Sequence, residues 1–254
     1  MKTKKTLFII ITVLSWISFW IPCAGQDKKD TLTVLFVGNS HTYTRNLPHV
    51  ISIISEGTKT KLMTKKSAIG AASLSQHWRN ERGLRTKEII KEGNFDIVVL
   101  QERNMEPVNE PDTVLKYTKL FCDYIKKYGG KPYLYLTWAR TNAPQNQEII
   151  NRVYSQAAKE NDAIVVPVGK AWALAKQLKP EINLHNPDGN HASVIGACLT
   201  AYVFVSTITG ELPEKLVDEF EIVDQFGETI QVLDVKSEDV AFCKLVAEKI
   251  NEKQ

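Results

Sequence analysis

The chain lacks any long apolar run beyond its first 25 residues, and it has no Cys/His cluster with the spacing of metal ligands. We therefore expect no transmembrane helix in the mature protein, no metal and no cofactor. The sequence also has no large excess of charge of either sign. The formal net charge is +3, and Lys2, Lys4 and Lys5 all precede the first acidic residue, Asp27. The remainder is nearly neutral, which argues against binding to nucleic acid or to an anionic membrane.

Cysteine is scarce, with four residues in 254. Cys122, Cys198 and Cys243 lie in apolar helical patterns, so we expect them to be buried thiols, and one disulfide among them is the alternative. The sequence also lacks the glycines and lysine of a phosphate-binding loop and the glycines of a dinucleotide fingerprint. Nucleotide binding through either motif is therefore not expected.

The N-terminus has the three-part pattern of a signal peptide. A basic stretch at residues 2–5 precedes an apolar run, Leu7–Trp20, that is too short for a comfortable bilayer span. Cleavage after Gly25 would remove residues 1–25. This predicts an exported protein, periplasmic or secreted. An uncleaved anchor and a lipid attached to Cys23 are the alternatives.

Beyond residue 30, short apolar runs alternate with helical patterns, which predicts a parallel sheet covered by helices on both faces. The expected strands are Leu32–Val37, Lys61–Ser67, Phe95–Leu100, Tyr133–Thr137 and Ala163–Val168. The expected helices between them are Arg45–Ser55, one long helix from Ser73 to Gly93, Asp112–Tyr128 and Gln145–Asn161.

Residues 26–254 are expected to form a single domain, because no linker or repeat interrupts the pattern. Its core would span about residues 31–210. An appendage at about residues 211–254 would contain a hairpin of Phe220–Val223 and Thr229–Val235 and a closing helix, Asp239–Ile250.

The first expected strand ends in Gly38-Asn39-Ser40. Ligands of parallel α/β sheets bind beyond the carboxyl ends of the strands, so Ser40 is placed to act as a nucleophile at the start of a helix. Residue 42 is Thr, so the segment is not the nucleophile elbow of α/β hydrolases. A serine that merely caps the next helix is the alternative. His41, beside it, is expected at the rim of the site.

A second element, Asp188-Gly189-Asn190-His191, lies near the end of the alternating region. An Asp three residues before a His in a turn can hold the imidazole, and the His can then act as a general base toward Ser40. A turn that contains both residues without catalysis is the alternative.

Together the two elements resemble the SGNH/GDSL hydrolase superfamily, which has a Gly-Asp/Asn-Ser block after its first strand and an Asp-x-x-His block near its C-terminus. The resemblance covers about residues 31–210. It implies a flavodoxin-like αβα sandwich with about five parallel strands, and a triad of Ser40, His191 and Asp188.

The resemblance also implies an oxyanion hole, made by the N–H groups of Ser40 and of a Gly after the second strand, and by an Asn amide after the third. Gly70 is in the right place for the Gly, although a turn glycine is the alternative. The family's Asn is replaced here by Gln101, and Asn104 is the other candidate. Glu102, which follows Gln101, is expected to pair with Arg103.

The implied activity is serine-dependent hydrolysis of carboxylic esters, with glycan or other small-molecule esters as substrates and carbohydrate deacetylation favoured. The alternatives are a non-catalytic protein that binds glycans or acyl groups, and a thioesterase or lysophospholipase. Trp138 and Arg140 follow the fourth strand and are the candidate substrate-binding residues. Trp138 could stack on a sugar ring and Arg140 could meet a carboxylate, with core packing and a surface charge as the alternatives.

Overall fold

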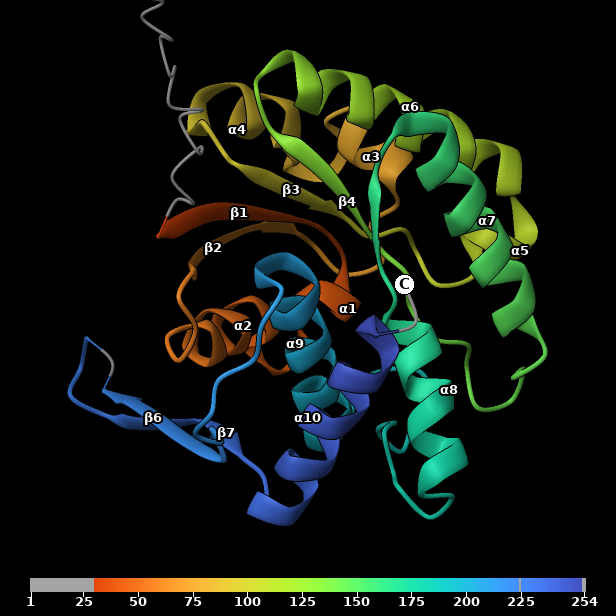
Figure 1. The fold of residues 1–254 in the computed structure, drawn as a ribbon. Helices are drawn as coiled ribbons and strands as arrows, with labels where there is room; N and C mark the ends of the chain where they lie inside the picture. The colour runs from red at the N-terminus through yellow and green to blue at the C-terminus, as the bar shows by residue number, and fades with distance from the viewer. Residues whose placement is uncertain (1–29, 224, 253–254) are drawn as a thin grey trace, which may run out of the picture.

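The structure is a computed structural model that describes residues 30–223 and 225–252. Its centre is a parallel five-stranded sheet with the strand order β2-β1-β3-β4-β5 (Figure 1). This order is that of flavodoxin-like folds, so the predicted fold class is confirmed. The strands are β1 (Thr31–Gly38), β2 (Lys61–Ala68), β3 (Ile97–Leu100), β4 (Lys131–Tyr135) and β5 (Ile164–Val166).

The sheet separates two apolar cores, because residues of alternate parity along each strand face opposite sides. In β1, Val34 and Phe36 join one core, and Leu35 and Val37 join the other. One face is covered by α2 (Leu47–Ser55), α8 (Val168–Leu178), α9 (Val194–Thr209) and α10 (Ser237–Asn251). The other face is covered by α3 (Leu74–Trp78), α4 (Thr86–Gly93), α6 (Pro111–Lys127) and α7 (Asn146–Asn161).

The single long helix expected from Ser73 to Gly93 is wrong. The segment contains α3, a 3₁₀ turn at Glu81–Gly83, and α4. Asn80 and Gly83 adopt left-handed backbone conformations, with φ of 56° and 76°. Asn and Gly accept this conformation at low cost, and it cannot continue a right-handed helix.

The expected C-terminal hairpin and closing helix are confirmed as β6 (Glu219–Val223), β7 (Thr229–Asp234) and α10. Helix α10 packs against α9, and its buried residues belong to the same core as α9. The hairpin projects to the side of this layer (Figure 1). Helix α10 therefore covers α9, and the hairpin lies beside the helices on that face of the sheet.

Helix α9 is apolar nearly all round, because it lies between the sheet and α10. It begins directly after the Asp188-x-x-His191 segment. The expected signal peptide and Cys23 lie outside the described residues. Within the described part of the chain, no helix has both the length and the apolarity needed to cross a membrane. Cys122, Cys198 and Cys243 are buried free thiols, as expected.

Candidate active site

Ser40 is the first residue of α1 (Ser40–Tyr43), which follows the C-terminal end of β1. Asn39 caps this short helix, because its side-chain oxygen accepts a hydrogen bond from the His41 N–H at 3.2 Å. The sharp entry requires Gly38. A Cβ at Gly38 would lie 2.4 Å from the Gln101 Oε1 and 2.4 Å from the Thr42 Oγ1. The glycine therefore allows the strand end and the serine turn to pack closely.

His191 lies beside this serine although 151 positions separate them in the sequence. The His191 Nε2 is 2.8 Å from the Ser40 Oγ, and the Nδ1 is 2.6 Å from the Asp188 Oδ2. The other Asp188 oxygen accepts hydrogen bonds from the backbone N–H groups of Asn190 and His191, both at 3.0 Å. The structure thus brings the three expected triad residues into one hydrogen-bonded chain.

The electrostatics of Asp188 and His191 suit a general base at His191. The hydrogen bond from His191, reinforced by the two backbone N–H groups, holds the pKa of Asp188 well below its usual range. An ionised Asp188 requires a proton on the Nδ1 of His191. The Nε2 then carries the lone pair that faces the serine hydroxyl, as the acceptor of its proton must. The side chain of His191 is 27% exposed, so a small molecule can reach this pair.

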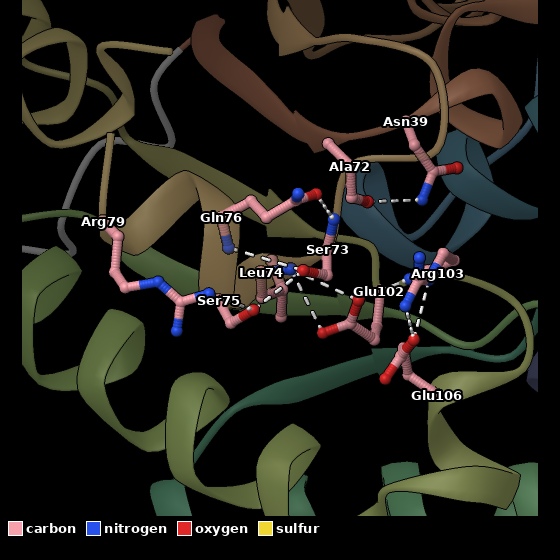
Figure 2. Close-up of polar contacts among 10 residues, drawn as sticks. All are labelled: Asn39, Ala72, Ser73, Leu74, Ser75, Gln76, Arg79, Glu102, Arg103 and Glu106. Carbon is pink, nitrogen blue, oxygen red and sulfur yellow. Dashed lines mark hydrogen bonds and ion pairs between the residues drawn. The ribbon is translucent and has the colours of Figure 1, made fainter. Parts of the chain in front are cut away.

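Gly70 follows β2 in a turn closed by a hydrogen bond from the Ala72 N–H to the Ile69 carbonyl. Figure 2 shows the contact that holds this turn near the serine: the Asn39 Nδ2 donates to the Ala72 carbonyl at 2.9 Å. Within the described residues, the N–H groups of Ser40 and Gly70 donate to no acceptor. Both remain available to an oxyanion.

The third expected donor, Gln101, is not available to a ligand. Its side chain is fully buried, and its Oε1 accepts hydrogen bonds from the Asn39 N–H and the Thr42 hydroxyl, both at 2.9 Å. Its Nε2 donates to the Glu102 carbonyl. Asn104 is also buried and donates to the Trp138 carbonyl at 2.9 Å. Neither amide faces an open site. Gln101 joins the segments that follow β1 and β3, and Asn104 joins the segments that follow β3 and β4.

Contrary to expectation, Glu102 forms no ion pair with the Arg103 guanidinium. The Glu102 carboxyl group is buried and accepts hydrogen bonds from the N–H groups of Leu74 and Arg103, while the Arg103 guanidinium pairs with Glu106 (Figure 2). Burial raises the pKa of Glu102 to about 8. Glu102 therefore joins the end of β3 to the start of α3, beyond the Gly70 turn.

Trp138 is not a platform for a sugar ring. It is 2% exposed, and its ring stacks on Trp172 from α8 with centroids 3.7 Å apart. Its Nε1 donates to the Asn190 carbonyl at 2.8 Å, which supports the loop that carries His191. Arg140, two residues later, is exposed.

His41 was expected at the rim of the site, and this is wrong, because the side chain is buried. Its ring lies between the rings of His191 and Trp138, with centroid distances of 5.1 and 5.3 Å. Its Nε2 is buried and has no hydrogen-bond partner among the described residues. Burial, followed by the nearby His191, lowers the pKa of His41 to about 3. The position next to Ser40 was the available signal, but its packing depends on two distant segments.

A cavity of about 620 Å³ lies between the end of α1, the start of α9 and strand β7, and none of Ser40, Asp188 and His191 lines it. Tyr43, three residues after Ser40, forms part of its wall. The Tyr43 hydroxyl also lies 3.2 Å from the position of a Cβ at Gly70. The residues that give the cavity its polar character are Tyr43, Arg45, Asn46, Gln231 and Asp234. Its size is that of a small-molecule site.

Comparison with known proteins gives a likeness in structure alone: no family model matches the sequence, and no curated protein matches it. A protein from Slackia heliotrinireducens assigned to the SGNH hydrolases has a TM-score of 0.60 and 22% identity, over 70% of this chain and 99% of that one. A DUF4886 family protein from Bacteroides uniformis has a TM-score of 0.64 and 17% identity, over 88% and 95%.

An acetyl xylan esterase has a TM-score of 0.56 and 15% identity, over 70% of this chain and 100% of that one. The three likenesses extend over 70 to 88% of this chain and 95 to 100% of the other proteins. This chain therefore has the fold of the SGNH/GDSL hydrolases.

Proposed function

We propose that this protein is a serine-dependent carboxylic ester hydrolase with Ser40 as nucleophile, His191 as general base and Asp188 as the residue that orients it. The observation that carries the proposal is the continuous chain from the Asp188 Oδ2 through the His191 ring to the Ser40 Oγ, with contacts of 2.6 and 2.8 Å. Such a chain is the arrangement that activates a serine hydroxyl.

In the proposed reaction, the His191 Nε2 takes the proton of Ser40 while the Oγ forms a bond to the ester carbonyl carbon. The Ser40 and Gly70 N–H groups donate to the oxyanion. His191 then gives the proton to the leaving alcohol as the ester C–O bond breaks. Water, deprotonated by His191, attacks the acyl-enzyme, and the acid leaves as Ser40 regains its proton. Gln101 takes no part in this path except through the loops it holds.

Acetylated or otherwise acylated carbohydrates are the substrates we propose. The 620 Å³ cavity, which Tyr43 of the helix that begins at Ser40 helps to line, offers phenol, amide, carboxylate and guanidinium groups, which are suited to hydroxyl-rich ligands. The acetyl xylan esterase among the structural neighbours agrees with this choice. We further propose that the mature protein begins at Gln26 and is exported, on the basis of the N-terminal pattern alone.

The test is hydrolysis of p-nitrophenyl acetate by the protein from Gln26, beside Ser40→Ala and the matched control Ser237→Ala, a serine at the start of α10. We expect activity in the parent and the control, and background rates in Ser40→Ala. Background rates in all three proteins would refute the esterase. Acetylated xylo-oligosaccharides, an acyl thioester and a lysophospholipid then separate the substrate classes, and preference for either of the last two would refute the carbohydrate assignment.

A further inference from the structure

A second cavity, of about 270 Å³, lies between the segment that follows β4 and helix α8. Arg140 and Lys176 line it, and none of its lining residues is Asp or Glu. Both cations are exposed, and neither forms an ion pair with a carboxylate in the described part of the chain. We refer to it as the Arg140 pocket. Two cations with no acidic neighbour in the lining favour an anionic group.

His185 adds a different requirement to the Arg140 pocket. Its side chain lines the pocket and the residue is 7% exposed. The Nε2 lies 3.2 Å from the Ala139 carbonyl, so this nitrogen must carry the proton. The Nδ1 is then a buried acceptor, and no donor among the described residues reaches it. Burial lowers the pKa of His185, which favours this neutral form. A ligand that satisfies Nδ1 must offer a hydroxyl or an N–H.

Three packed aromatic rings line the Arg140 pocket. Trp138 and Trp172 stack with an interplanar angle of 3°, and the His185 ring meets Trp172 edge-on, with centroids 4.9 Å apart. The pocket volume is near the lower end of the range for small-molecule sites, which suits a single ring rather than a chain. The ligand must therefore be small, anionic and able to donate a hydrogen bond.

We propose that the Arg140 pocket binds a sugar acid, with the carboxylate at Arg140 and Lys176 and a ring hydroxyl donating to the Nδ1 of His185. Acetate or sulfate would satisfy the cations and leave the imidazole without a donor, whereas a neutral sugar would do the reverse. A uronic acid unit does both.

Two lining residues of the Arg140 pocket are hydrogen-bonded to the loop that carries Asp188 and His191. The Thr141 N–H donates to the Gly189 carbonyl at 2.9 Å, and the Trp138 Nε1 donates to the Asn190 carbonyl. Arg45, which lines the larger cavity, also contacts this loop at Asn186. Resting on the proposed function, this places the binding of an acidic unit of a glycan next to the loop that carries Asp188 and His191.

The experiment is calorimetric titration of the protein from Gln26 with methyl β-D-glucuronoside, methyl β-D-glucoside and inorganic sulfate. The two glycosides differ at one carbon, carboxylate against hydroxymethyl. We expect saturable binding of the glucuronoside, at least tenfold tighter than that of the glucoside or of sulfate. Equal affinity for the two glycosides would overturn the proposal. Equal affinity for sulfate would reduce the pocket to a simple anion site and would overturn the sugar acid.

Variants locate the binding. Arg140→Ala and Lys176→Ala should each weaken glucuronoside binding about tenfold, while the control Lys170→Ala, an exposed cation on α8 that does not line the pocket, should not. His185→Phe keeps an aromatic ring against Trp172 and removes both ring nitrogens, so it should weaken the glucuronoside and leave sulfate unchanged. Unchanged glucuronoside affinity in the first two variants would also overturn the proposal.

Titration of Ser40→Ala separates this proposal from the esterase. Binding of the glucuronoside should be the same as in the parent, since Ser40 does not line the pocket. Binding without hydrolysis of p-nitrophenyl acetate by the parent would refute the esterase and leave the sugar acid site standing. Hydrolysis without glucuronoside binding would refute the site alone.

Discussion

Replacement of Glu102 by Gln should make the protein less sensitive to alkaline pH. The buried carboxyl group has a pKa of about 8 in the folded protein, against 4.5 for the free group. Between these values the folded state keeps a proton that the unfolded state releases, so stability falls as pH rises. A pKa difference of this size lowers the free energy of unfolding by about 3–4 kcal/mol between pH 5 and pH 8.

An amide cannot ionise, so this loss should be absent in Glu102→Gln. The single oxygen of the amide can still accept from the N–H groups of Arg103 and Leu74, which both reach the Oε1 of Glu102. The difference in melting temperature between variant and parent should therefore grow by roughly 10 °C from pH 5 to pH 8, because about 1 kcal/mol corresponds to 2–4 °C in a domain of this size.

Thermal melts followed by circular dichroism across this pH range measure the difference. Other titrating groups act equally in both proteins and cancel. Glu92→Gln, a neutralisation at an exposed position of α4, is the matched control and should show a constant difference from the parent. A difference for Glu102→Gln that is equally constant with pH would refute the reasoning that burial governs this carboxyl group.

Three further predictions concern the serine turn and the triad. Asp188→Asn should lower kcat for p-nitrophenyl acetate about 10³–10⁴-fold with an unchanged fold, because an amide does not hold the required tautomer of His191; a loss below tenfold would contradict this. His41 is neutral when folded but titrates near 6.5 when unfolded, so stability falls as pH drops from 6.5 toward 3. His41→Phe should reduce that fall in acid melts, and parallel curves would contradict it. Gly38→Ala should destabilise by about 1–3 kcal/mol in urea unfolding, because its Cβ would collide with Gln101; unchanged stability would show that the turn can relax.

The elements that carry the chemistry could be predicted from sequence because their signals are local. A continuous apolar run such as Leu32–Val37 is typical of a strand in a parallel sheet that is covered on both faces. The Gly-Asn-Ser segment that follows it, and the Asp188-x-x-His191 turn, need only the rule that sites form beyond strand ends. The described structure places these two segments within hydrogen-bonding distance.

The features that could not be predicted depend on contacts between distant segments. Gln101 turns inward because Gly38 has no side chain, so its amide can reach the backbone of Asn39. Trp138 is buried because Trp172, 34 positions later, stacks on it. Neither contact has a local signal, and an amide or an indole just beyond a strand end is equally compatible with a ligand contact.

The buried position of α9 has a consequence for how the proposed activity should be lost on heating. His191 lies two residues before Ser193, which caps α9, and that helix is enclosed by the sheet and α10. The imidazole therefore cannot move far from Ser40 unless the helix leaves the core. The base and the core belong to one cooperative unit, so thermal inactivation should coincide with global unfolding instead of preceding it. The slowest amide hydrogens to exchange should include those of α9, a few residues from the proposed base.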